Sequence, residues 1–424
     1  MKILLILGLV SLTLVSNSVQ ALTIDQAVAD ALQHNPQIQQ FLEIESAASA
    51  RTDVAKAPFW PRIDTNYRYW WEDRDPNLDN RKLSVAEARA DYNLFNGGSD
   101  WFRLHEARYK ASAANYKRRS IVADIVLEAK KAYIEILRAK RNVATEGKSV
   151  ELLAQQRHDT QLRLEQGLIA RNDLLRVDVE MATAQQRLAL AKGRYEIARN
   201  VMAKTLGRTL GSEEQVADFS LQPVSLQQEE VLRQVMFTKR SELHFLRSLL
   251  AGQEAGRKAV QGDLMPDVDL ILSYTWFDNN GLPEISYAGY DSETKAIVQA
   301  SWTLFSGFDT SYELIGRKHE IRSRQEEIKA TEDQLTLQLQ TALEAFRVSE
   351  RNLATAITAV VQAEENYRVN DNRYQANVAS TVDLLDAQEF LTRARNEKVK
   401  AQYDLFLAEA VIERVLERGP TLSK

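Results

Sequence analysis

The sequence predicts a mostly α-helical protein that carries membrane β-strands and is built from one unit used twice. Three observations predict this fold class. Short motifs return in the same order about 210 residues later. Each copy contains helical stretches much longer than a globular core requires. Each copy also contains two segments in which apolar and polar residues alternate, as they do in strands of membrane β-barrels.

The duplication is read from three pairs of motifs, which place a first repeat at 22–207 and a second at 208–424. Helix-breaking prolines and glycines separate the predicted elements within each repeat. The paired motifs are WPRID at 60–64 and MPDVD at 265–269, NLFNG at 93–97 and TLFSG at 303–307, and DLL at 173–175 and 383–385.

Residues 1–21 are predicted to be an export signal that is removed. Lys2 supplies the positive start, an apolar run follows, and Val19-Gln20-Ala21 is a plausible cleavage site. No later stretch reaches the roughly 20 apolar residues that a membrane-spanning helix needs. We therefore expect the mature chain to enter a membrane, if at all, through its strands.

Both repeats are expected to run helix, strand, strand, very long helix, tight turn, helix. The first helix of each repeat is predicted as one piece, near 23–56 and near 228–262. The strands are predicted at about 61–72, 83–95, 267–277 and 295–305, and the long helices at about 99–165, 171–206, 309–375 and 380–418.

The long helices have the periodicity of a coiled coil. Large residues recur every seven positions along 339–374, and small residues follow three places after most of them. This spacing indicates helices packed closely along one seam. A helix of some 65 residues would be roughly 100 Å long. A soluble bundle of amphipathic helices would show the same heptads, so the helices alone leave that alternative open.

The four strands each present an apolar face and a polar face. Six tryptophans, at 60, 70, 71, 101, 276 and 302, lie in the strands or at their edges, where membrane interfaces collect indole rings. Four strands cannot close a barrel, and an open edge in lipid leaves backbone groups unpaired. Several copies must therefore join. The expected apolar faces are Ile63, Thr65, Tyr67, Tyr69 and Trp71; Ala86, Ala88, Ala90, Tyr92 and Leu94; Val268, Leu270, Leu272, Tyr274 and Trp276; and Ala296, Val298, Ala300, Trp302 and Leu304.

Composition excludes several classes of function. The chain has no cysteine and a net charge of −5, so disulfides, thiol catalysis and a basic nucleic-acid surface are not expected. It has no phosphate-binding glycine loop and no histidine pair at ligand spacing. We therefore predict neither an enzyme nor a cofactor or metal site.

Taken together, the strands, the long helices and the motifs at 93–98, 166–175 and 374–386 resemble those of the TolC family of outer-membrane exit ducts. The resemblance covers essentially the whole mature chain. It implies a homotrimer with a twelve-stranded β-barrel in outer-membrane lipid and a coiled-coil tunnel through the periplasm. It also implies two partners, a periplasmic adaptor (a membrane fusion protein) and an inner-membrane pump of the ABC or RND type.

The resemblance also implies a constriction at the periplasmic end, at Asp383 and Asp386. Because these two residues are three apart, they share one helical face, and three chains would place six carboxylates around the channel. Such a ring attracts cations and can raise its own pKa values. A solvated acidic helix start is the plainer alternative.

Tyr374 and Asp173 match family positions that hold the end closed. The family arginine expected five residues after the tyrosine is Ala379 here, so Arg171 or Arg373 is a candidate substitute in the closing network. The turns between the long helices match the loops that dock the adaptor. The candidate docking residues are Gly167, Leu168, Ala170, Ala376 and Val378.

The leading hypothesis is a passive trimeric duct across the outer membrane and periplasm, exporting a protein by type I secretion. The missing lipidation cysteine near the start of the mature chain favours the secretion branch weakly. An outer-membrane component of a small-molecule efflux pump is the alternative. A soluble coiled-coil scaffold is the alternative from another class, and the amphipathic strands disfavour it.

Overall fold

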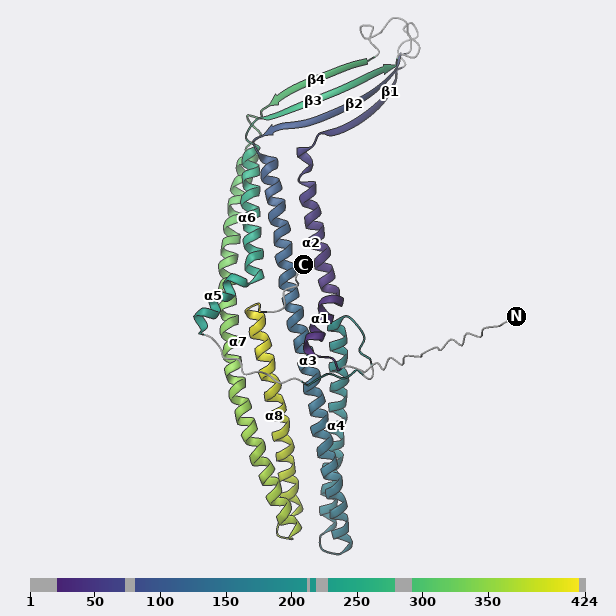
Figure 1. Cartoon of the computed structure of the whole chain (residues 1–424), viewed down its shortest axis with the longest axis vertical. Helices are drawn as coiled ribbons and strands as arrows, with labels where there is room; N and C mark the ends of the chain where they lie inside the picture. The colour runs from purple at the N-terminus through teal and green to yellow at the C-terminus, as the bar shows by residue number, and fades with distance from the viewer. Residues whose placement is uncertain (1–20, 73–80, 212–213, 219–227, 279–291, 419–424) are drawn as a thin grey trace, which may run out of the picture.

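The computed structural model describes residues 21–72, 81–211, 214–218, 228–278 and 292–418. The predicted export signal, apart from Ala21, lies outside the described residues, as do most of the loops within the two strand pairs. The molecule is elongated, with a sheet at one end and long helices extending from it (Figure 1).

The sheet has four antiparallel strands in the order β1-β2-β3-β4. Its cross-strand register confirms that most of the predicted apolar residues share one face: Ile63 lies opposite Ala90, Ala90 opposite Leu272, and Leu272 opposite Ala296. Leu94, which a bulge removes from the register, and Trp302 and Leu304, which lie beyond the end of β4, are exceptions to the prediction. A bulge at Leu94 interrupts the alternation of β2. The strands are β1 (Arg62–Glu72), β2 (Arg81–Asn96), β3 (Asp267–Asp278) and β4 (Ser292–Ser301).

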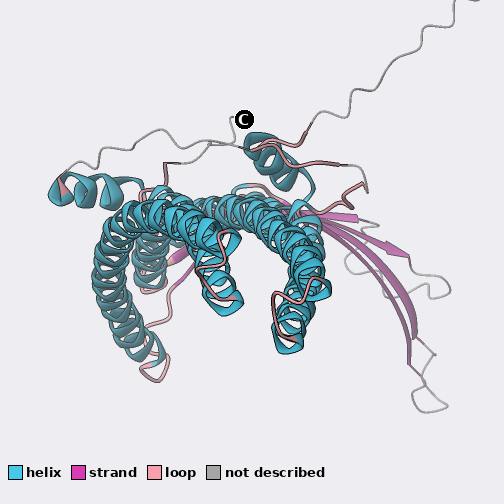
Figure 2. Cartoon of the chain, turned by 90° about the horizontal axis from the view of Figure 1, so that it is seen from below, coloured by secondary structure: helices cyan, strands magenta, loops and turns pink. Residues whose placement is uncertain are grey.

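Two helical hairpins form the rest of the long axis. The first is α3 (Ser99–Glu165) with α4 (Arg171–Leu206), and the second is α7 (Asp309–Gln375) with α8 (Thr381–Val415). Because α3 also packs against α8, the helices lie in the order α4, α3, α8, α7. Seen from below they form an open arc (Figure 2).

The upper helix of each repeat is broken, which corrects the expectation of one continuous helix near 23–56 and another near 228–262. The first consists of α1 (Ile24–His34) and α2 (Pro36–Val54), and the second of α5 (Glu229–Lys239) and α6 (Ser241–Gly262). Asn35 is held extended before Pro36, as the proline ring requires. Arg240 takes the same place in the second repeat, also extended.

Two element ends also differ from the expectation. Strand β4 ends at Ser301 rather than near 305, since the chain turns there into α7 and Trp302 Nε1 donates to the carbonyl of Leu264 at 3.1 Å. Helix α8 ends at Val415 rather than near 418, because Glu417 adopts a left-handed φ of 49°.

The connection from sheet to helix depends on glycine. Gly97, in the repeated motif, has a φ of 64°, and a Cβ there would lie 2.2 Å from the carbonyl oxygen of Gly262. The matching Gly307 has a φ of 71°. This close approach packs the end of α6 directly against the turn between β2 and α3.

The core lies around the middle of the long helices α3 and α7. Tyr133 of α3 is fully buried in the larger apolar cluster, and its hydroxyl donates to the carbonyls of Leu22 at 2.9 Å and Ala217 at 2.6 Å. A second cluster joins α5, α7 and α8 around Leu339 and Leu343. Within the described residues, no helix is long and apolar enough to cross a bilayer.

Candidate functional site

The two hairpin turns lie at the end of the molecule farthest from the sheet (Figures 1 and 2). Both turns close in the same way. Gly167 and Asn377 have left-handed φ values of 73° and 58°, and the next amide in each turn donates to an arginine carbonyl, at 2.9 Å and 2.8 Å. The predicted docking residues are all exposed on these turns: Gly167, Leu168, Ala170, Ala376 and Val378.

Asp383 and Asp386 are exposed on the first turns of α8. Asp383 forms a capping box with Ser380, whose amide and hydroxyl each donate to Oδ2 at 2.9 Å. These bonds, and the positive charge of Arg373, lower the pKa of Asp383. In one chain, Asp383 is therefore a well-stabilised carboxylate, whereas crowding in a ring would act in the opposite direction.

Tyr374 is buried at the end of α7, with 4% of its surface exposed. Its hydroxyl lies 3.4 Å from the hydroxyl of Thr160 on α3. The guanidinium of Arg163 covers its ring, 4.4 Å from the centroid. Arg163 also donates to the Tyr374 carbonyl at 3.1 Å and to the Asn377 side-chain oxygen at 2.5 Å. Tyr374 is therefore bound to α3 of its own chain.

The other predicted members of the closing network take no part in this contact. Arg171 and Arg373 are exposed, and Asp173 is half-buried in the first turn of α4. The prediction missed Arg163, although the repeat pairs it with Arg373, 210 positions later in the sequence. The correspondence between Arg163 and Arg373 in the two repeats is the sequence signal that could have identified Arg163.

Polar residues also line the seam between α3 and α8 above the tips. The amide of Gln388 donates to the Ser149 carbonyl at 3.4 Å, and the amide of Asn396 donates to Glu146 at 2.7 Å. Ser149 and Gln388 are each 3% exposed. Directional hydrogen bonds therefore help to set the position of the two hairpins here, in a stretch where Leu153, Leu384 and Leu391 are also buried.

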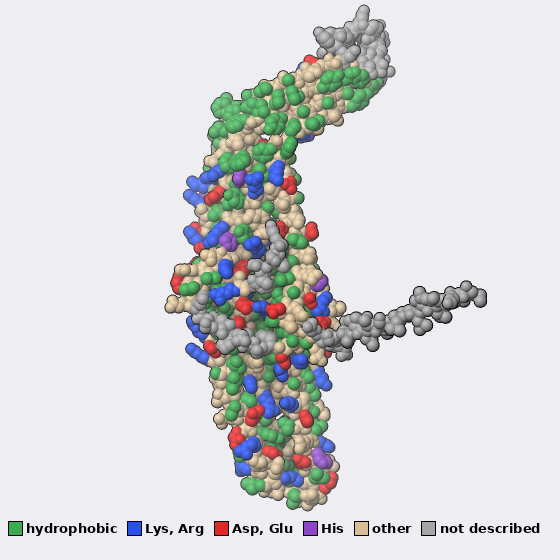
Figure 3. Space-filling model, viewed as in Figure 1, with side chains coloured by type: hydrophobic (Ala, Val, Ile, Leu, Met, Phe, Trp, Pro, Cys, Tyr) green, Lys and Arg blue, Asp and Glu red, His purple; other side chains and the backbone are tan. Residues whose placement is uncertain are grey.

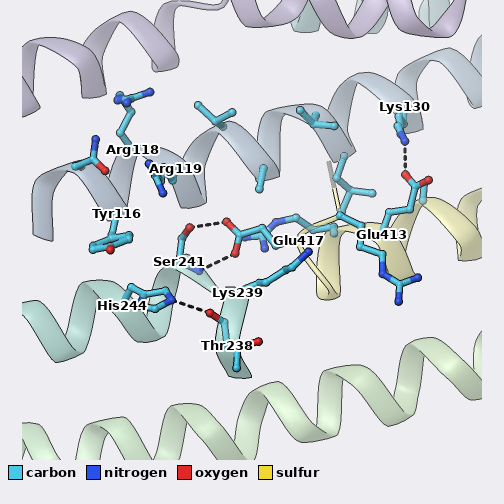
Figure 4. Close-up of a pocket in the computed structure, with 18 residues that line it drawn as sticks. Tyr116, Arg118, Arg119, Lys130, Thr238, Lys239, Ser241, His244, Glu413 and Glu417 are labelled. Atoms are coloured by element: carbon cyan, nitrogen blue, oxygen red, sulfur yellow. Dashed lines mark hydrogen bonds and ion pairs between the residues drawn. The ribbon is translucent and has the colours of Figure 1, made fainter. Parts of the chain in front are cut away.

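A cavity of about 800 Å³ opens where α3, α6 and α8 meet (Figure 4). Glu417 accepts hydrogen bonds there from the amide and hydroxyl of Ser241, at 2.6 and 2.5 Å, and so caps α6. Lys130 pairs with Glu413 across the same hollow. These groups stabilise the joint between helices. Among the described residues, no cluster of acidic or histidine side chains could hold a metal ion.

The outer face of the sheet is apolar and uncovered. Figure 3 shows hydrophobic side chains concentrated over the strands, while most of the charged side chains lie over the helices, mixed with other side chains. Tyr67, Tyr274 and Val298 are 67%, 50% and 67% exposed. Among the residues that the structure describes, no strand pairs with the outer edge of β1 or of β4. Such a surface is typical of a sheet that contacts an apolar environment and pairs with further strands.

Comparisons with known proteins agree with this arrangement. The model of the family described as "Outer membrane efflux protein" matches residues 27–208 and 243–416, one segment in each predicted repeat. Protein CyaE of Bordetella pertussis is 24% identical over 88% of this chain and 79% of its own length. The alkaline protease secretion protein AprF of Pseudomonas aeruginosa is 23% identical over 90% of this chain and 81% of its own. The structure of the Campylobacter jejuni CmeC outer membrane channel superposes with a TM-score of 0.83 at 12% identity, covering 93% of this chain and 85% of that one.

Proposed function

Because the chain belongs to the outer membrane efflux protein family, whose members are channels rather than enzymes, we propose that three copies form one passive exit duct. The chain is an outer-membrane protein whose helices extend into the periplasm. The duct would dock a periplasmic adaptor and an inner-membrane pump at its helical tips, and the pump would supply the energy.

The observation that carries this proposal is the sheet. It combines an exposed apolar face with two edges that no other described strand of the chain covers. In lipid each unpaired backbone group costs several kcal/mol, so the edges must pair with those of other copies. Three four-stranded sheets would supply the twelve strands that the family resemblance implies.

The proposed client is a protein exported by type I secretion. One relative supports this choice, since AprF is named for the secretion of an alkaline protease. Small-molecule efflux is the second candidate, favoured by the description of the family itself.

The proposed gate lies at the tips, where Asp383 and Asp386 of three chains would form a carboxylate ring. Tyr374, Asp173, Arg171 and Arg373 would hold the closed end together. The exposure of both aspartates on one face of α8 supports the ring. The turn residues would form the adaptor-docking surface, supported by the exposure of Leu168 and Val378, at 59% and 67%.

Single-channel recording in a planar bilayer tests the duct and the ring together. We expect cation-preferring openings that lose their selectivity in Asp383→Asn/Asp386→Asn, because a carboxylate ring attracts cations. Glu230→Gln removes one exposed charge from α5, remote from the tips, and serves as the control. Unchanged selectivity in the double variant would place the constriction elsewhere, and well-folded oligomers that never conduct would overturn the duct.

Deletion of the gene in its native host distinguishes the two proposed kinds of substrate, a secreted protein and small molecules. Under the secretion proposal, the deletion strain loses specific proteins from the culture medium, and its resistance to dyes and antibiotics is unchanged. The reverse pattern would favour efflux. Complementation with the wild-type gene controls for effects on neighbouring genes.

A further inference from the structure

Arg163 connects the two hairpin tips within one chain. From the last turn of α3, its guanidinium covers the Tyr374 ring and donates to the carbonyls of Tyr374 and Gln375, at 3.1 and 3.5 Å, and to Asn377. Cation–π contact and three hydrogen bonds at a helix end make this a specific connection. We call it the Arg163 contact.

The repeat contains a second arginine with the same local structure. Arg373 occupies the last turn of α7, as Arg163 occupies the last turn of α3. Its carbonyl accepts the turn amide of Val378, as the Arg163 carbonyl accepts that of Leu168. Yet Arg373 is exposed. To form the same hydrogen bonds as Arg163, it would need the carbonyls of a second helix end and turn like the one that Arg163 contacts.

The helix order shows where that turn would be. Within one chain, α3 of the first repeat packs against α8 of the second. In the repeat, α7 corresponds to α3 and α4 corresponds to α8, so the equivalent contact is α7 against α4. These two helices lie at opposite ends of the order α4, α3, α8, α7 and cannot pack together within one chain. A closed ring of copies brings α7 of one copy beside α4 of the next. The face that α4 leaves uncovered in one chain is apolar, with Leu175, Val179, Leu190, Ile197 and Val201 all exposed.

We propose that Arg373 reaches the α3–α4 turn of the neighbouring copy. There it donates to the main-chain carbonyls of Leu164 of the partner subunit and Glu165 of the partner subunit, which correspond to Tyr374 and Gln375. The proposal rests on the ring of the proposed function. It makes the closed end a cycle in which Arg163 contacts within chains alternate with Arg373 contacts between chains.

The contact between copies is the weaker of the two. Leu164 offers no aromatic face where Tyr374 does, and Gly167 offers no side-chain amide where Asn377 does. Glu165 partly compensates, because its carboxylate replaces the neutral Gln375 and attracts the guanidinium. An exposed ion pair of this kind is weakened by salt. The seams between copies should therefore separate first, leaving each chain's hairpins joined.

Paired cysteines test the proposal directly, because the chain has no native cysteine. Arg373→Cys/Glu165→Cys joined by a short bis-maleimide should convert monomers into covalent dimers and trimers on a denaturing gel. The matched pair Arg163→Cys/Gln375→Cys places cysteines at the equivalent positions of the Arg163 contact. This pair should run as a monomer on the denaturing gel, because its cross-link lies within one chain. Mass spectrometry of proteolytic fragments should detect that intramolecular cross-link.

The native mass of the uncross-linked protein in detergent distinguishes the two possible failures. A trimer in which Arg373→Cys/Glu165→Cys stays uncross-linked would overturn the contact and leave the duct intact. A protein that is monomeric throughout would overturn both. Single-cysteine variants control for random collisions.

A channel measurement covers the case in which the cysteine variants do not fold. Glu165→Gln should raise the open probability about threefold, the size of one exposed ionic contact, and Arg373→Gln should raise it at least as much, because it also removes the hydrogen bonds. The double variant should raise it no further than Arg373→Gln alone. Independent, multiplying effects would contradict a shared contact.

Discussion

At the scale of single residues, Ser380 determines the chemistry of the proposed gate. Its hydroxyl both accepts from the Asp383 amide at 3.2 Å and donates to the Asp383 carboxylate. One serine therefore starts α8 and keeps an acid charged at the tip. Ala170, the equivalent residue at the start of α4, makes no side-chain cap.

Ser380→Ala should shift the pH dependence of ion selectivity upward. Losing the hydroxyl raises the pKa of Asp383 toward its ordinary value, so the carboxylate would be protonated at a higher pH as the solution is acidified. Reversal potentials recorded between about pH 3 and 6, around the ordinary aspartate pKa, measure this shift. Ser306→Ala removes a similar bond to Asp309 at the opposite end of α7 and should leave the midpoint unchanged. Identical midpoints in all three proteins would contradict a role for Asp383 in selectivity.

Tyr133 predicts a loss of stability in alkali. Burial, followed by the charges of Asp218 and Asp25, raises its pKa to about 12. The unfolded chain ionises this tyrosine near pH 10, so its contribution to stability is complete below that pH and declines as pH rises toward 12. Tyr133→Phe should melt at a lower temperature at pH 8, because two carbonyls lose a donor. Its melting temperature should then fall less steeply than that of the wild type between pH 10 and 12. Parallel curves would show that Tyr133 does not carry this dependence.

At the scale of elements, the two helix breaks share a position and differ in chemistry. Asn35 caps α2 through Gln37 and donates to the Thr205 carbonyl near the end of α4, at 3.0 Å. Arg240 donates to the Arg414 and Val415 carbonyls at the end of α8, at 2.6 and 3.1 Å. In both repeats, the break residue therefore supplies donors to a helix end that lacks its own.

Arg240→Met should destabilise the protein by about 3 kcal/mol, because it leaves buried carbonyls and Glu242 with fewer partners. Thermal melting followed by circular dichroism would show the loss as a lower transition temperature. Arg233→Met, which breaks only an exposed pair with Glu230 on α5, should change the transition by about 0–0.5 kcal/mol. Equal effects of the two variants would contradict the role of Arg240 at the joint.

At the scale of the whole molecule, the sheet and the helices have different environments. The strands present an exposed apolar face, and the helices carry most of the charged side chains, mixed with other side chains (Figure 3). The glycine junction at Gly97 holds these two parts close together. This division is consistent with a sheet in the membrane and helices that extend away from it into water.

Val298→Lys should reduce assembly in the membrane, because a cation on the lipid-facing side of a barrel costs about 2–4 kcal/mol near mid-membrane. The adjacent Gln299→Lys places the same charge on the opposite face of β4 and should have little effect. The yield of oligomers that resist heating in detergent, extracted from membranes, measures the difference. Equal yields would contradict the assignment of the two faces.

Periodic features were predictable from the sequence because they depend on local spacing. Alternation in β1 to β4 predicts which residues share a face, and the structure's register confirms this up to the bulge at Leu94 and the end of β4. Heptads and the absence of helix breakers gave the long helices. The break before Pro36 was also visible in the sequence, but the prediction gave too little weight to this proline. Arg240 has no comparable local signal, since its partners are carbonyls 174 and 175 residues away.

The sequence by itself determined the duplicated plan, the mostly helical fold with membrane strands, and membership of a family of outer-membrane ducts. Repeats and periodicities are properties of neighbouring residues, so they can be read without coordinates. Only the tertiary structure decided that Arg163, rather than Arg171 or Arg373, covers Tyr374 within the chain. That contact depends on which helices lie side by side, and packing across the whole chain sets this order.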